Sequence, residues 1–178
     1  VPPHENPGVQ LGLAMGLAGL EGRDKVTIFS SNKVADFGAW AEQLIAESTG
    51  KEGRGLIPVD GETLADASRY GNDRFFIDLR VAGEDDAAHD EKLAALEKAG
   101  HPMVRIVMQS IDHLGQEFFR FELATAGVGA ILGINPFNQP DVESAKIKTR
   151  ELTSAFEKTG KLPAETPVVS SAEADLYT

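Results

Sequence analysis

A glutamate and a lysine stand out as residues that could do chemistry, because each falls on the apolar side of a predicted helix. Glu47 lies in the last turn of a helix predicted over residues 34–49, close to Trp40 on the helical wheel. Partial burial and the negative end of the helix dipole would both disfavour its charged form, as suits a general base. Lys146 shares a stripe with Val142 in a later helix. We expect it to face inward, where a charge needs a partner or a ligand.

Gln139 stands at the start of that later helix and is followed by Pro140, a residue that suits a first helical turn. A helix N-terminus also favours anionic groups. Plainer interpretations stay open for all three residues. Glu47 could be a solvent-facing residue at a helix end, Lys146 could extend to the surface, and Gln139 could simply cap its helix.

The elements that must position these residues alternate along the chain. Strand patterns cover residues 25–30, 55–59, 74–81 and 104–108, and helical patterns cover residues 7–20, 34–49, 87–99, 115–133 and 140–158. Such alternation implies crossover connections and a parallel sheet covered on both faces. We therefore predict an α/β fold: a three-layer αβα, flavodoxin-like domain with a doubly wound, mostly parallel sheet of four or five strands. Pro58 favours an edge strand.

Residues 1–159 are expected to form this domain and residues 160–178 a polar C-terminal tail. The formal net charge of -11 argues against nucleic-acid binding, and no apolar stretch is long enough to span a membrane. The chain has no Cys, which excludes thiolate sites and fits a cytoplasmic location. No dinucleotide, phosphate-loop or paired-His motif occurs, so we expect no cofactor and no metal. Most of the four His residues are expected in loops or at the surface.

Two segments carry a resemblance to a known family. Residues 129–146 read GAILGINPFNQPDVESAK. They resemble the second signature of the glucose-6-phosphate isomerase family, in which an aromatic residue precedes Asn/Asp-Gln-x-Gly-Val-Glu-x-x-Lys. Asp141 stands where the family has Gly. Residues 47–51, ESTGK, resemble the end of a family helix that carries Glu-Ser-x-Gly-Lys.

A more particular resemblance concerns the isomerase half of bifunctional transaldolase/glucose-6-phosphate isomerase fusions. Their segments look like residues 71–74, GNDR, and residues 115–120, GQEFFR, of this chain. The fold implied by both resemblances is a sugar-isomerase domain, in agreement with the alternation of strands and helices. A transaldolase barrel would then lie upstream of Val1.

The resemblance implies aldose–ketose isomerisation of glucose 6-phosphate and fructose 6-phosphate through an enediol. Glu47 would move the proton, Lys146 would help to open the sugar ring, and Gln139 would contact the substrate. The family's phosphate-binding Ser/Thr cluster and its Gly-Gly-Arg signature are missing here, and both belong to an N-terminal sugar-isomerase domain. The chain is therefore expected to be the C-terminal part of the enzyme, with that domain as its partner, and to be inactive alone.

The family's ring-opening His is also missing, because residues 59–74 contain no His. Either a neighbouring residue such as His113 replaces it or ring opening relies on Lys146. We expect Glu47, Lys146 and Gln139 to face one cleft, framed by the strand ends near Gly55 and Ser110. The alternatives are a non-catalytic, regulatory sugar-phosphate-binding domain of the same fold and an interaction module.

Overall fold

The structure is a computed structural model that describes residues 2–84 and 86–177. It divides into two compact units, one ending at Asn138 and one beginning at Gln139. We call them the sheet unit and the C-terminal unit, and each is described by itself.

The sheet unit contains four strands that are all parallel, in the order β2-β1-β3-β4. The strands are β1 Lys25–Ser30, β2 Ile57–Val59, β3 Arg74–Val81 and β4 Met103–Met108. Each one matches a predicted strand to within two residues. Pro58 lies in β2 at the edge of the sheet, as expected of a residue that has no backbone N–H to donate to a neighbouring strand.

Four helices precede, connect or follow these strands: α1 Pro7–Leu20, α2 Ala35–Thr49, α3 Ala87–Lys98 and α4 Leu114–Leu132. Short 3-10 turns cover Pro3–Glu5, Asn32–Val34, Ala67–Arg69 and Ile111–His113. In a βαβ unit the helix returns the chain to the edge where parallel strands begin. α2 therefore starts at the carboxyl edge of the sheet and ends at the amino edge, and α4, which follows β4, runs the same way.

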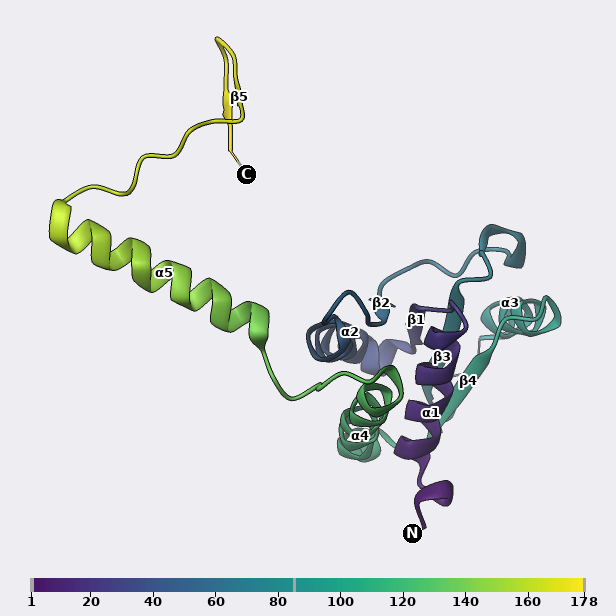
Figure 1. Ribbon diagram of the computed structural model, residues 1–178. Helices are drawn as coiled ribbons and strands as arrows, with labels where there is room; N and C mark the ends of the chain where they lie inside the picture. Colours follow the sequence, from purple (N-terminus) through teal and green to yellow (C-terminus); the bar gives the residue numbers. More distant parts are fainter. Residues whose placement is uncertain (1, 85, 178) are drawn as a thin grey trace. The chain divides into compact units, whose positions relative to one another are not determined.

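Helices cover both faces of the sheet, which confirms the three-layer αβα prediction (Figure 1). Alternate residues of a strand point to opposite faces. Phe75 and Ile77 of β3 belong to a large core with α1, α2 and α4, while Phe76 packs against α3 on the other face. His101, just before β4, is also buried and lies edge-on to the ring of Phe76, so it departs from the surface location expected of most His residues.

α1 and α4 pack unusually closely, and Figure 1 shows them side by side. A Cβ added to Gly12 would lie 2.6 Å from the carbonyl oxygen of Ala124 and 3.0 Å from its Cα. A Cβ on Gly16 would lie 2.7 Å from the Cδ1 atom of Ile131. Gly12 and Gly16 are therefore needed for this close contact with α4.

The C-terminal unit consists of α5, Pro140–Thr159, and a short antiparallel hairpin of β5, Val169–Ser170, and β6, Asp175–Leu176. The hairpin lies within the segment predicted as a polar tail. No residue of α5 is buried within this unit. Among the helices of the described residues, none combines the length and apolar character that crossing a membrane requires.

Candidate functional site

The first resemblance segment and the part of the second that lies in the sheet unit, residues 129–138, meet at the amino edge of the sheet. α2, which carries Glu47, ends there at Thr49, and α4 ends there at Leu132. Two basic side chains from the turn after α2 bond to the last residue of α4 and to the turn that follows it. Segments about 80 positions apart in the chain are joined in this way.

Lys51 makes the first of these links. Lys51 is only 6% exposed. Its Nζ donates hydrogen bonds to the carbonyl oxygen of Asn135, at 3.0 Å, and to that of Asn138. Arg54 makes the second link, from Nη1 to the carbonyl oxygen of Leu132 at 2.6 Å. The last carbonyls of a helix carry a partial negative charge, so a guanidinium is favourable at the end of α4.

The turn after α2 is built to present both side chains. The Thr49 hydroxyl donates to the carbonyl of Ile45 at 2.8 Å and accepts from the Leu56 amide at 2.9 Å, which ties the helix end to the start of β2. Glu52 and Gly53 both have positive φ, 57° and 72°, so the chain reverses tightly between Lys51 and Arg54.

The turn after α4 explains why the second resemblance segment begins with a small residue, Gly129, in the last turn of that helix. A Cβ on Gly129 would lie 2.6 Å from the ring of Pro136, so only glycine leaves room for the chain to fold back. The Ile134 amide then donates to the carbonyl of Gly129 at 3.0 Å. Asn135 accepts from the Phe137 amide at 3.0 Å through its Oδ1, an Asx turn that shapes the approach to Asn138.

Glu47 is exposed within the sheet unit, so the partial burial predicted for it is wrong there. The reason is its position on the outward side of α2, whereas Ile45 and Thr49 point into the core. Gln43, one turn earlier, donates from Nε2 to Glu47 Oε1 at 3.3 Å. Sequence reasoning missed this partner, although a separation of four residues on a helix is a signal for such a pair.

Lys146 and Gln139 belong to the C-terminal unit. Lys146 is exposed, and its Nζ lies 3.1 Å from Oε1 of Glu143. The predicted inward orientation is therefore wrong within this unit, where α5 buries none of its residues. Gln139 precedes α5 as its N-cap, and its carbonyl accepts from the Glu143 amide at 3.0 Å, whereas its side chain makes no capping bond. That Glu47, Lys146 and Gln139 face one cleft stays a prediction.

The expected frame of that cleft is wrong. Gly55 precedes β2 and lies at the amino edge, whereas Ser110 follows β4 and lies at the carboxyl edge. His113 is also at the carboxyl edge, separated from the amino edge by α4, whose 19 residues extend about 28 Å. Within the sheet unit His113 is therefore no neighbour of Glu47.

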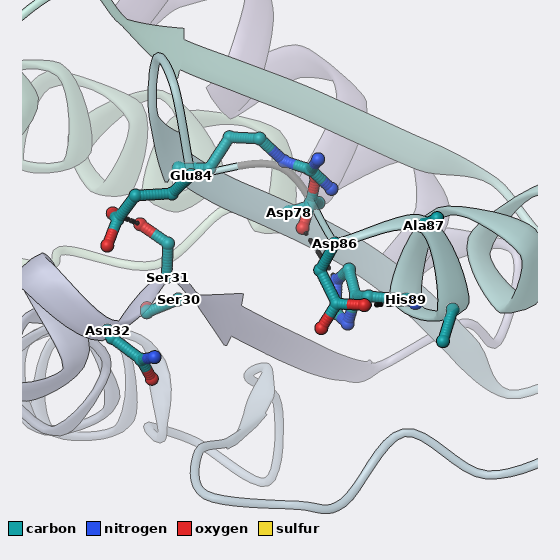
Figure 2. Close-up of a pocket in the computed structure, with 10 residues that line it drawn as sticks. Ser30, Ser31, Asn32, Asp78, Glu84, Asp86, Ala87 and His89 are labelled. Carbon is teal, nitrogen blue, oxygen red and sulfur yellow. Dashed lines mark hydrogen bonds and ion pairs between the residues drawn. The ribbon is translucent and has the colours of Figure 1, made fainter.

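A crevice of about 680 Å³ opens at the carboxyl edge, between β1 and β3 (Figure 2). The connections from these two strands leave in opposite directions across the sheet, the usual position of ligand sites in open α/β sheets. Ser31 Oγ donates to Glu84 Oε2 at 2.6 Å and accepts from the Val81 amide at 3.1 Å, so the first turn after β1 is fixed to the end of β3.

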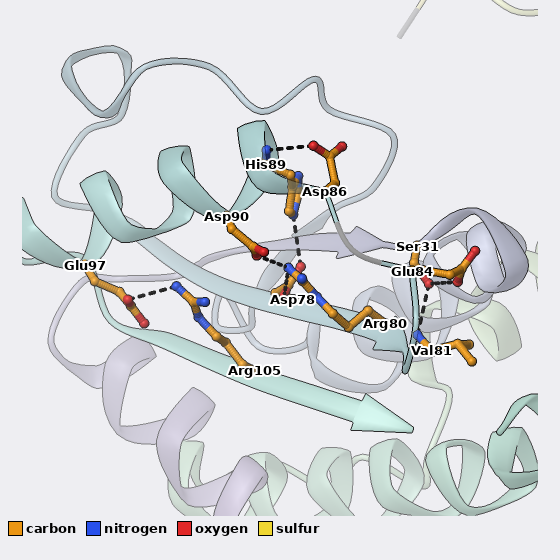
Figure 3. Close-up of polar contacts among 10 residues, drawn as sticks. All are labelled: Ser31, Asp78, Arg80, Val81, Glu84, Asp86, His89, Asp90, Glu97 and Arg105. Atoms are coloured by element: carbon orange, nitrogen blue, oxygen red, sulfur yellow. Dashed lines mark hydrogen bonds and ion pairs between the residues drawn. The ribbon is translucent and has the colours of Figure 1, made fainter. Parts of the chain in front are cut away.

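Deeper in this crevice a buried carboxylate organises the polar groups (Figure 3). Asp78 Oδ2 accepts a hydrogen bond from Nε of Arg80 at 2.9 Å, and Asp78 Oδ1 lies 3.0 Å from Nε2 of His89. Nη2 of Arg80 also forms an ion pair with Oδ1 of Asp90 at 2.8 Å, and this guanidinium lowers the pKa of Asp90. The one guanidinium among the described lining residues is thus already shared by two carboxylates, while Glu84 adds further negative charge. These surroundings are unfavourable for a phosphate.

Groups of His, Asp and Glu with the arrangement of a metal site do not occur among residues 2–84 and 86–177.

No family model matches the chain. Its sequence is nevertheless similar to several known proteins that are named glucose-6-phosphate isomerase. The protein of this name from Onion yellows phytoplasma is 29% identical over 81% of this chain and 43% of its own length. The one from Methanocaldococcus jannaschii is 28% identical over 80% of this chain and 44% of its own length. The one from Lactobacillus delbrueckii is 31% identical over 62% of this chain and 33% of its own length.

The chain thus spans between a third and somewhat under half of the length of these relatives. Among solved structures, a hypothetical protein from Thermus thermophilus is similar with a TM-score of 0.62 and 18% identity. That similarity covers 79% of this chain and 43% of the other, and at this identity it supports the α/β fold alone.

Proposed function

We propose that this chain is the C-terminal sugar-isomerase part of an aldose–ketose isomerase, which interconverts glucose 6-phosphate and fructose 6-phosphate through an enediol. The observation that carries the proposal is the link made by Lys51, which joins the helix end bearing Glu47 to the turn that leads into Gln139. The names of the relatives support the same reaction.

In this proposal Glu47 is the general base. It removes the proton from the carbon beside the carbonyl and returns it to the neighbouring carbon. Exposure within the sheet unit leaves its carboxylate open to a substrate, and the hydrogen bond from Gln43 restricts its orientation. Lys146 donates to the ring oxygen during opening, and Gln139 contacts the sugar. The roles of Lys146 and Gln139 rest on the sequence resemblance.

The phosphate is proposed to bind outside this chain. The carboxyl-edge crevice is rich in carboxylates, and its guanidinium is already paired. We therefore assign the phosphate donors to an N-terminal sugar-isomerase domain. A transaldolase barrel preceding that domain, and a cytoplasmic location, are further parts of this proposal that rest on the sequence alone.

The test is the replacement Glu47→Gln in the full-length protein that contains this sequence. Conversion of fructose 6-phosphate is measured by coupling glucose 6-phosphate to a dehydrogenase. Loss of a general base should lower kcat about 10²–10⁴-fold. Glu122→Gln is the matched control, because Glu122 is an exposed glutamate on another helix of the same unit, and it should leave kcat unchanged.

Both variants should keep the thermal midpoint of the wild type. A decrease of kcat under about tenfold for Glu47→Gln would refute the role of this residue. Binding of the sugar phosphate without turnover by the wild type would instead favour a regulatory domain of the same fold.

A further inference from the structure

The most unusual charge in the sheet unit is that of Lys51. A lysine is almost never buried unless its charge is paired. Here the residue is 6% exposed, and the described partners of its ammonium are two backbone carbonyls, those of Asn135 and Asn138. Desolvating an ammonium is unfavourable, and carbonyl dipoles offset this less completely than a carboxylate. A methionine of similar length would fill the same space without that penalty.

The two carbonyls belong to a segment with few other constraints. Residues 133–138 follow α4 and connect it to Gln139, and Asn135, Phe137 and Asn138 are exposed. Apart from Lys51, the segment is shaped by the buried Ile134, whose amide donates to the carbonyl of Gly129, by the Asx turn from Asn135 to the Phe137 amide and by the contact of Pro136 with Gly129. Lys51 bonds to the segment at two points three residues apart. It therefore fixes both the position and the direction of the chain at Asn138.

The other end of the link is equally defined. Lys51 lies four residues after Glu47, and the intervening backbone is held by the buried hydroxyl of Thr49. A displacement of residues 135–138 would therefore change the position of the chain entering Gln139 relative to the carboxylate of Glu47.

We propose that Lys51 is a positioning residue of the isomerase: by holding the carbonyls of Asn135 and Asn138, it fixes the segment that precedes Gln139 on the helix end that carries the base. This inference rests on the proposed function. Lys51 acts through these neighbours and exchanges no proton with the sugar. Arg54 anchors the end of α4 itself, through Leu132, and has no such role.

The experiment compares Lys51→Met with Arg54→Met. Each replaces a cation that donates to a carbonyl of the same region, and the thermal midpoint of both variants is measured so that a change in global stability can be separated from a local effect. Hydrogen exchange is measured on the 178-residue chain. Lys51→Met should speed exchange of the Phe137 amide at least about tenfold, because the Asx turn loses its support. Arg54→Met should change it less than about threefold.

Kinetics are measured in the full-length protein. Lys51→Met should lower kcat about 10–100-fold with a much smaller change in KM, since small misplacements of catalytic groups have effects of this size. The shape of the pH profile should be unchanged, and Lys51→Arg should recover part of kcat because it keeps the charge and the donors. Arg54→Met should stay within about threefold of the wild type.

Unchanged exchange at Phe137 in Lys51→Met would overturn the inference, as would equal losses of kcat in Lys51→Met and Arg54→Met. A wild-type kcat in Lys51→Met with faster exchange would show that the link is structural only. Equal activity of the wild type and Glu47→Gln would refute the proposed function, and the catalytic half of this inference with it. The two failures are thus distinguishable.

Discussion

The ammonium of Lys51 lies 3.0 Å from the carbonyl oxygen of Asn135, a residue 84 positions further along the chain. Lys51 belongs to the resemblance segment at the end of α2, and Asn135 belongs to the one that continues after α4. Because both helices end at the amino edge of the sheet, the fold itself brings these motifs together. The link gives their joint presence a structural reason.

Packing between α1 and α4 should be sensitive to a single methyl group. Gly12→Ala would place a Cβ 2.6 Å from a backbone oxygen of α4, which cannot move independently of the helix. Such overpacking costs about 1–3 kcal/mol, more than the gain of at most about 1 kcal/mol in helix propensity. We expect the thermal midpoint to fall by at least about 2 °C.

Gly115→Ala is the matched control for this prediction. Gly115 lies in the first turn of α4, and an added Cβ there would meet no atom within 4 Å among the described residues. Its midpoint should stay equal to or slightly exceed that of the wild type. Equal effects of the two replacements would show that α1 and α4 are not in the close contact described.

Acidification should destabilise the protein through His101. Burial lowers the pKa of this imidazole, so the folded state keeps it neutral where the unfolded chain already binds a proton. The unfolded state therefore binds more protons as the pH falls through about 6.5, and the free energy of unfolding decreases. The measurement is the urea midpoint at about pH 7.5 and about pH 5.5, on either side of that value.

His101→Phe keeps an aromatic ring against Phe76 and removes the titration, and the Nδ1 that it removes has no hydrogen-bond partner among the described residues. Its midpoint should fall less on acidification than that of the wild type. His4→Gln, which removes an exposed imidazole, should behave like the wild type. The same decrease in all three proteins would show that His101 does not titrate differently on folding.

Much of the fold follows from local patterns. The ranges of the four strands and the edge position of Pro58 are visible in the sequence and confirmed in the structure. The link from Lys51 could not be predicted, because its acceptors are backbone carbonyls, which every residue carries. Gly55 precedes one parallel strand and Ser110 follows another, so the sequence pattern itself places them at opposite edges of the sheet and not around one cleft.

Glu47 and Lys146 are exposed, although their positions on helical wheels predict partial burial. A helical wheel orders residues by angle but does not say which part of the stripe a neighbour covers. α5 has an apolar stripe that includes Val142 and Phe156, yet both are exposed within the C-terminal unit.

The 178-residue chain alone should fold but should not isomerise fructose 6-phosphate at a useful rate. Folding is expected because the sheet unit has its own core of α1, α2, α4 and the strands. Catalysis should fail without the phosphate donors proposed for the N-terminal domain. Two or three charge-assisted hydrogen bonds, each worth about 1.5–3 kcal/mol, correspond to several orders of magnitude in affinity.

Circular dichroism and the coupled assay, applied to the chain and to the full-length protein, check this prediction. A cooperative thermal transition with no detectable turnover is the expected result for the chain. Turnover comparable to that of the full-length protein would mean that the phosphate site lies within these 178 residues.

The most direct test of the central claim, that Glu47 moves a proton through an enediol, follows deuterium in the full-length protein. Fructose 6-phosphate is converted in D₂O, and the glucose 6-phosphate formed is analysed for deuterium at the carbon next to the aldehyde. A base that exchanges with solvent should introduce deuterium there, and Glu47→Gln should slow product formation about 10²–10⁴-fold. Conversion by Glu47→Gln at the wild-type rate, with the same deuterium content, would contradict the account.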